Sequence, residues 1–272
     1  MFLSLVPLLV GCGTPTIQNA SGASSSGGSE ITSSASSSSS SASSGGGQAH
    51  PLALVYRGPA GCDGCSEAVA AALQSSSKHF DVTYVGPHDT ALDDALLSKA
   101  MVYAQPGGDG TVESAFAFVA ADSARIRAFV EAGGRYLGFC MGGYFAGAMP
   151  GFQILPGDTD GFISSKGASV TSDADTLVDV IWRGKKRSLY FQDGPYFILG
   201  SGATGATGVT VLATYASNGL PAAVVAPFGM GKAGVVGPHP EAPQDWYDAY
   251  GLHDPDGLDV DLAHDLIETT MQ

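Results

Sequence analysis

The sequence predicts an α/β domain built on a doubly wound, mostly parallel sheet. Short apolar runs alternate with segments of helical spacing from Leu52 to Phe139, which is the pattern of a parallel sheet with crossover helices. After Ala168 the pattern changes to a series of short strand-like runs. The residues with the most reactive side chains follow expected strands, where open α/β sheets place their sites.

The first half of the domain contains apolar runs of strand length separated by helical segments. The first run is expected to be a central strand, and the last helix is expected to stop at Gly133-Gly134. The expected strands are Leu52–Tyr56, Phe80–Val85, Ala100–Ala104 and Arg135–Phe139, and the expected helices are Ser66–Gln74, Thr90–Lys99 and Ser123–Ala132.

The second half contains shorter runs with turn residues between them. Two of the runs are expected to pair around a turn at Gly184, and a glycine-rich turn is expected at Gly229–Lys232. The expected strands are Leu177–Trp182, Arg187–Phe191, Val209–Tyr215, Ala222–Pro227 and Ala233–Val236, followed by a closing helix at about Leu258–Met271.

The strand Arg135–Phe139 runs directly into Gly138-Phe-Cys140-Met-Gly142. This is the G-x-nucleophile-x-G pattern of a nucleophile elbow, in which glycines allow a sharp turn that exposes the nucleophile at the start of a helix. A helix N-terminus lowers the pKa of a thiol and raises its thiolate fraction. The alternative is a cysteine buried in the core, which is common for free cysteine.

Gly237-Pro-His239-Pro-Glu241 supplies the two partners that a thiol nucleophile needs. His239 can take the proton and Glu241 can orient the imidazole. A hydrogen-bonded core histidine, and a carboxylate at a helix N-terminus, are the alternatives for these two residues.

Five ordered stretches resemble the amidotransferase-like N-terminal domain of biotin-protein ligases, a branch of the class I glutamine amidotransferase-like superfamily. They extend over roughly residues 52 to 271. The stretches are Leu54–Ala60, Gln105–Asp109, Leu137–Phe145, Val211–Tyr215 with Pro221–Val225, and Gly229–Lys232 leading to Gly237–Glu241. The resemblance implies a flavodoxin-like three-layer domain with a Cys140, His239, Glu241 triad.

The resemblance also implies an oxyanion hole formed by the backbone N–H groups of Gly108 and Met141. Asp109 and Tyr144 are candidate substrate contacts, although a solvated loop aspartate is the simpler interpretation of Asp109. The segment Tyr190–Tyr196 is either a pocket wall or an ordinary aromatic-rich hairpin, and the hairpin is favoured.

These features favour amide or acyl hydrolysis of a small amide, amino-acid or peptide ligand through a Cys140 thioacyl intermediate. A non-catalytic binding module that retains the pocket is the second interpretation. The sequence ends at Gln272, shortly after His239, so we expect no biotin-ligase catalytic module and no ammonia-using synthetase here. No cofactor or metal is expected.

Residues 1–12 contain a short apolar run ending in Leu9-Val-Gly-Cys12, which resembles a lipoprotein signal peptide with Cys12 as the lipidation site. Residues 13–50 are rich in Ser and Gly and are expected to be a disordered tether, leaving 51–272 as the domain. We therefore expect a lipid-anchored protein of the bacterial cell envelope. The alternative is a frayed N-terminus with an incidental cysteine.

Cys62 and Cys65 form a C-x-x-C pair at the start of an expected helix. A structural disulfide is favoured in an exported protein, and a redox-active dithiol remains open as a third functional interpretation. A zinc site lacks a second ligand pair. The formal net charge of -14 makes nucleic acid an unsuitable partner. The sequence does not define an oligomeric state.

Overall fold

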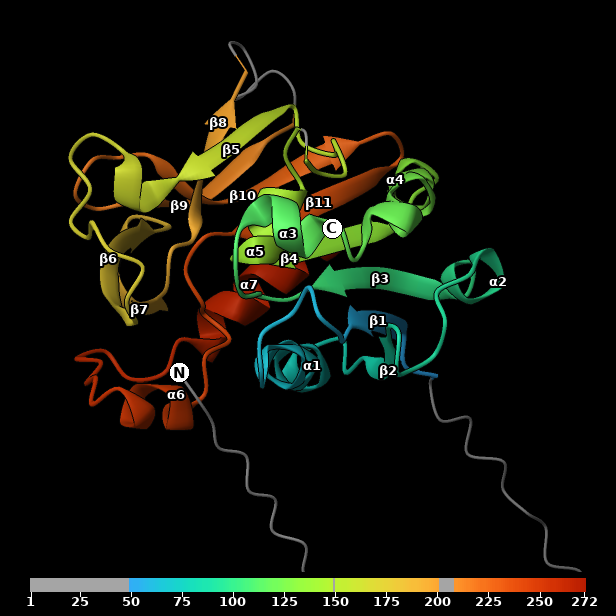
Figure 1. The fold of residues 1–272 in the computed structure, drawn as a ribbon, viewed down its shortest axis with the longest axis horizontal. Coiled ribbons are helices and arrows are strands. Elements are labelled where there is room, and N and C mark those ends of the chain that lie inside the picture. Colours follow the sequence, from blue (N-terminus) through green and yellow to red (C-terminus); the bar gives the residue numbers. More distant parts are fainter. Residues whose placement is uncertain (1–48, 149, 201–207) are drawn as a thin grey trace, which may run out of the picture. The chain divides into compact units, whose positions relative to one another are not determined.

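The computed structural model describes residues 49–148, 150–200 and 208–272, all of which belong to one compact unit (Figure 1). In chain order the elements are β1 (Leu52–Tyr56), α1 (Cys65–Ser75), β2 (Asp81–Val85), α2 (Asp94–Leu97), β3 (Ala100–Gln105), α3 (Val112–Phe116), α4 (Ser123–Glu131), β4 (Arg135–Phe139), α5 (Met141–Phe145), β5 (Gly157–Gly161), β6 (Thr176–Trp182), β7 (Lys185–Phe191), β8 (Pro195–Leu199), β9 (Thr210–Tyr215), β10 (Pro221–Phe228), β11 (Gly231–Val236), α6 (Gln244–Ala249) and α7 (Val260–Met271).

The main sheet has nine strands in the order β2-β1-β3-β4-β11-β10-β9-β6-β7. The strands from β2 to β11 in that order run parallel, and the pairings from β11 to β7 are antiparallel. β5 and β8 form a separate antiparallel ribbon. The carboxyl ends of β3, β4 and β11 therefore meet at one edge of the sheet, which is where parallel sheets place their sites.

Helices cover both faces of the sheet, so the domain has three layers (Figure 1). On one face Val69 and Leu73 of α1 pack with Leu266 and Ile267 of α7 in a single buried cluster. On the other face α4 and α5 bury their apolar side chains against strand residues such as Tyr136. The parallel strands β1, β3 and β4 are consequently buried on both sides, which explains their near-continuous hydrophobic sequences. The fold is a doubly wound α/β domain with a mixed sheet.

Three expectations from the sequence need correction. β1 is second from the edge of the sheet instead of central, because β4 and β11 occupy the middle. The helix expected at Thr90–Lys99 is only the short α2, because the Asp93 side chain accepts a hydrogen bond from the Leu96 N–H at 2.7 Å and so starts the helix late. The β5–β8 ribbon was not expected, since the sequence Gly157–Gly161 carries no apolar alternation.

The expected signal peptide, Cys12 and the tether lie outside the described residues, apart from the last residues before β1. Within the described ranges, no helix combines the length and apolar character that a membrane span requires.

Candidate active site

Cys140 occupies a strained turn between β4 and α5. Its backbone angles are φ 47° and ψ −106°, a conformation that residues with a side chain rarely adopt. A Cβ added at Gly138 would collide with the carbonyl of Gly142, and one added at Gly142 would collide with the carbonyl of Gln105. The Tyr136 hydroxyl donates to the Gly142 carbonyl at 2.6 Å and helps to hold the turn. Both glycines of the motif are thus required by close backbone contacts.

The thiol of Cys140 is nearly buried, with 6% of the residue exposed. Its Sγ donates a hydrogen bond to the carbonyl oxygen of Gln192 at 3.4 Å. Gln192 lies in the turn between β7 and β8, so a segment far away in the sequence forms one wall beside the thiol. Cys140 nevertheless lines a cavity and is accessible from it.

His239 follows β11 and is held in place on both sides of its ring. Its Nδ1 bonds with Oε1 of Glu241 at 2.9 Å, and both side chains are buried. Its backbone N–H donates to the Tyr190 carbonyl at 2.9 Å, and its ring packs edge-on against Tyr190 and Trp246. Because Nδ1 is engaged by the carboxylate, Nε2 is the nitrogen left for Cys140.

The electrostatics of the three residues favour a charged imidazole. Burial on its own lowers the pKa of His239, but the neighbouring Cys140 and Glu241 raise it to about 10. Oε2 of Glu241 is buried and has no hydrogen-bond partner among the described residues. The charge of Glu241 is therefore balanced chiefly by the His239 ring, which stabilises the imidazolium.

The glycine loop after β3 lies against both Met141 and His239. A Cβ at Gly107 would lie 2.7 Å from Cε1 of His239, and one at Gly108 would lie 3.2 Å from Cγ of Met141. Within the described ranges, the backbone N–H groups of Gly108 and Met141 donate to no protein acceptor. Both residues line the cavity beside Cys140, so both N–H groups are free to bind an oxygen of a ligand there.

Cys62 and Cys65 are joined by a disulfide at the start of α1. The Cys62 N–H donates to the Gly107 carbonyl at 3.0 Å, and a Cβ at Gly107 would lie 3.3 Å from Sγ of Cys65. The disulfide therefore borders the glycine loop and, through it, His239. Nothing in the order of the residues along the chain indicates this proximity.

Two cavities open on the site. One, of about 580 Å³, borders Cys140 and Tyr144, and the other, of about 490 Å³, borders His239 and the disulfide loop. Asp109 and Gln192 line both. The candidate contacts Asp109 and Tyr144 are therefore placed beside the nucleophile, and the Tyr144 hydroxyl donates to the Asp193 carbonyl at 3.1 Å.

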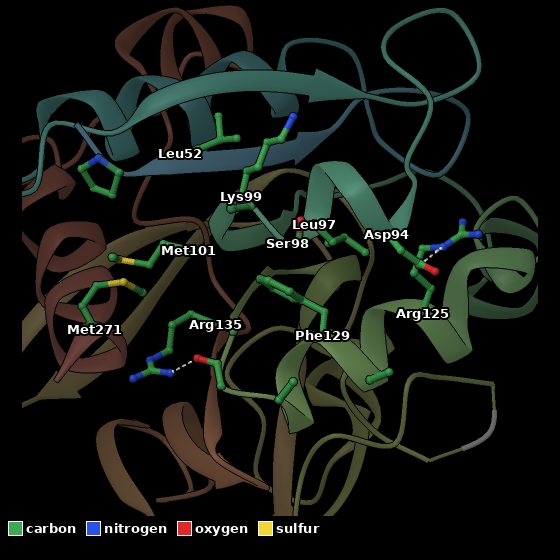
Figure 2. Close-up of a pocket in the computed structure, with 16 residues that line it drawn as sticks. Leu52, Asp94, Leu97, Ser98, Lys99, Met101, Arg125, Phe129, Arg135 and Met271 are labelled. Carbon is green, nitrogen blue, oxygen red and sulfur yellow. Dashed lines mark hydrogen bonds and ion pairs between the residues drawn. The ribbon is translucent and has the colours of Figure 1, made fainter. Parts of the chain in front are cut away.

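A cavity of about 800 Å³ lies elsewhere (Figure 2). It borders Leu52, Ala100 and Arg135, the first residues of β1, β3 and β4, and so lies at the amino ends of the strands. Cys140 follows the carboxyl end of β4. Sheets of this kind bind ligands at the carboxyl ends of their strands. We therefore assign the site to the two cavities that border Cys140 and His239.

The site contains residues that sequence reasoning did not assign. The segment Tyr190–Tyr196 is not a hairpin, because β7 pairs with β6 whereas β8 pairs with β5. Its turn places Gln192 and Asp193 at the Cys140 cavity, while Tyr190 and Trp246 line the His239 cavity. The run of aromatic residues in the segment was the signal for a pocket wall. In the described part of the chain, no cluster of three or more His, Cys, Asp or Glu side chains is arranged to hold a metal ion.

Comparisons with known proteins agree with this fold. Residues 52–160, which contain the glycine loop and Cys140, match the family model described as "Biotin-protein ligase, N terminal". A glutamine amidotransferase from Thermotoga maritima is similar in structure, with a TM-score of 0.54 and 15% identity over 82% of this chain and 99% of that chain. The fold is thus that of the glutamine amidotransferases, and its first half matches the N-terminal family of biotin-protein ligases.

Two further solved structures are similar over most of this chain. A cytoplasmic protein from Salmonella typhimurium LT2 has a TM-score of 0.49 and 12% identity over 82% of this chain and 100% of that chain. A β-galactosidase from Rahnella sp. R3 has a TM-score of 0.45 and 17% identity over 83% of this chain and 32% of that chain. No curated protein matches the chain.

Proposed function

We propose that this domain is a cysteine-nucleophile hydrolase of amides or related acyl compounds. The observation that carries the proposal is the position of His239, bonded to Glu241 through Nδ1 and interacting with Cys140, which lies in a strained turn. A nucleophile, a base next to it and a carboxylate that orients the base are the constellation that thiol catalysis needs.

In the first step of this mechanism, the Cys140 sulfur attacks the substrate carbonyl and His239 holds the thiol proton. The oxyanion that develops accepts hydrogen bonds from the N–H groups of Gly108 and Met141. When the tetrahedral intermediate collapses, His239 gives its proton to the leaving amine or alkoxide, and a thioester to Cys140 remains. His239 then takes a proton from water, the resulting hydroxide attacks the thioester, and the carboxylic acid and the free thiol are released.

A mass measurement on the full chain tests this proposal. The protein is mixed with the p-nitrophenyl ester and the p-nitroanilide of hexanoic acid, and both product release and intact mass are followed. We expect an acyl adduct on Cys140 and product release that Cys140→Ser removes. If Cys140→Ser releases product as fast as the wild-type protein, or if no adduct forms with either compound, the hydrolase proposal is wrong.

A binding module that retains the pocket is the second candidate. The hydrogen bond from the Cys140 thiol to the Gln192 carbonyl favours it, because the thiol is nearly buried and already has a partner. Thermal stabilisation by an amide ligand that persists in Cys140→Ser, without any acyl adduct in the wild-type protein, would support this second candidate.

We further propose that the domain is attached to the cell envelope through a lipid on Cys12. The support is the apolar run that ends in Leu9-Val-Gly-Cys12 and the Ser- and Gly-rich segment that follows it.

A further inference from the structure

The cavities that border Cys140 and His239 are lined by carboxylates. The Cys140 cavity contains the side chains of Asp109, Glu113, Asp160, Asp173 and Asp193. The His239 cavity shares Asp109 and adds Asp63, Asp175 and Asp245. Among the described residues that line either cavity there is no Lys or Arg, and His239 is the one basic side chain.

Several basic side chains of the domain are engaged elsewhere. Arg57 pairs with Asp89, Arg183 with Asp265 at 2.8 Å, and Arg187 with Asp259 at 2.6 Å. Three others, Lys99, Arg125 and Arg135, line the cavity at the opposite edge of the sheet (Figure 2). In the described ranges, none of the carboxylates that line the two site cavities takes part in a salt bridge, so their charge lacks a protein counter-ion.

Two of these carboxylates repel each other beside the nucleophile. Burial, and then the nearby carboxylate of Asp173, raise the pKa of Asp193 above its ordinary value. A neighbouring positive charge would lower that pKa again and would be favoured by both groups. The Gly108 and Met141 N–H groups supply the independent indication that a ligand carbonyl belongs here, since neither has an acceptor in the described residues.

The His239 cavity adds an aromatic surface to this charge. Tyr190, Trp246 and Tyr250 line it together with Asp175 and Asp245. The faces of aromatic rings attract cations, and the attraction increases where the rings are partly shielded from water. The lining of this cavity therefore suits an ammonium or guanidinium group and disfavours a carboxylate.

From these observations we propose that the substrate of the Cys140 site is a cationic amide or ester that carries an amine or guanidinium group and no free carboxylate. This inference rests on the proposed hydrolase function, because it assigns the charge of the substrate whose carbonyl Cys140 attacks. It also disfavours free glutamine as the substrate, since the α-carboxylate of glutamine would have to lie among aspartates that form no salt bridge in the described ranges.

Three esters of equal length separate the charge preference from general reactivity. The p-nitrophenyl esters of 6-aminohexanoate, hexanoate and adipate monoanion are cationic, neutral and anionic. The rate of Cys140 acylation is followed by intact mass at low and high salt. We expect the cationic ester to react fastest, and its advantage to shrink in 1 M salt, where charges are screened beyond about 3 Å. Equal rates, or a faster neutral or anionic ester, would overturn the inference.

Variants of the lining carboxylates localise the effect. Asp173→Asn combined with Asp193→Asn should slow acylation by the cationic ester about fivefold more than acylation by the neutral ester. Asp81→Asn is the matched control, because Asp81 is exposed at the amino end of β2, remote from the site. A loss that is equal for all three esters, or equal in the control variant, would contradict the assignment.

The charge preference and the hydrolase function fail in different ways. If no ester acylates Cys140, binding of 6-aminohexanamide, hexanamide and adipamic acid to Cys140→Ser is measured by calorimetry. Preferential binding of the cationic amide would support the charge preference and contradict the hydrolase function. If neither the acylation rates nor the binding measurements favour the cationic compound, the charge preference is wrong.

Discussion

Gly107 lies so close to the ring of His239 that a single added carbon would be 2.7 Å from Cε1. The same carbon would be 3.3 Å from Sγ of Cys65. The glycine loop thus contacts the base and the disulfide and also carries one of the candidate oxyanion donors. Because Gly107 has no side chain, the His239 ring can lie against the loop.

We expect Gly107→Ala to displace the His239 ring and to slow Cys140 acylation by about tenfold to a hundredfold, because small misplacements of catalytic groups carry large rate penalties. Stopped-flow measurement of p-nitrophenol release checks this. Gly61→Ala is the control, since a Cβ there meets only ordinary contacts at 3.4 Å or more. The same rate in both variants would mean that Gly107 does not position the base.

The Glu241–His239 pair should make stability depend on pH. The pKa of His239 is raised from 6.5 to about 10 in the folded protein, so the folded state binds this proton more tightly than the unfolded state. The resulting stabilisation is complete below the unfolded value of 6.5 and is lost as the pH rises through about 10. We expect Glu241→Gln to weaken this dependence, because the opposite charge is removed while the shape is kept.

Urea denaturation of the wild-type protein, Glu241→Gln and His239→Asn across that pH range measures the effect. His239→Asn serves as the reference in which this titration is absent. Identical pH dependence in all three proteins would show that the pair contributes nothing to the free energy of unfolding.

The disulfide between Cys62 and Cys65 should stabilise the domain only modestly, because the loop it closes is short. We expect Cys62→Ser with Cys65→Ser to lower the free energy of unfolding by about 2 kcal/mol in the chain-entropy treatment. Denaturation with and without reductant gives the measurement. Mass spectrometry of freshly purified protein alkylated without reduction gives the control, and two alkylated thiols at these positions would instead favour a dithiol with a redox role.

The nucleophile elbow could be predicted from sequence because its geometry is local. Gly138 and Gly142 are needed within a few residues of Cys140, and β4 precedes them directly. The His239–Glu241 hydrogen bond is local too, because the two residues are only two positions apart in the sequence.

The remaining walls of the site come from contacts between distant segments, which leave no periodic signal. Gln192 reaches Cys140 across 52 positions, and Trp246 reaches His239 through the short helix α6. The place of β1 in the sheet depends on how β4 and β11 pair, and neither strand's own sequence specifies that order. The acidic character of the cavities likewise becomes visible only when these segments are brought together.

Lipid attachment is expected at Cys12. Metabolic labelling with a clickable fatty-acid analogue should tag the protein in cells, and Cys12→Ser should remove the tag because no acceptor thiol remains at the lipobox-like motif. Cys140→Ser is the matched control and should keep the label. Undiminished labelling of Cys12→Ser would exclude this attachment site.

The most direct test of the account is the rate of Cys140 alkylation by iodoacetamide as a function of pH, in the wild-type protein and in His239→Ala. Cys62 and Cys65 are joined in the disulfide and do not react with iodoacetamide. In the described part of the chain, alkylation therefore measures the reactivity of Cys140. We expect the wild-type thiol to react faster than the thiol of His239→Ala at neutral pH, because His239 can take the thiol proton and its imidazolium stabilises the thiolate. A Cys140 that does not react in the folded protein, or a profile that His239→Ala leaves unchanged, would contradict the catalytic role of the pair.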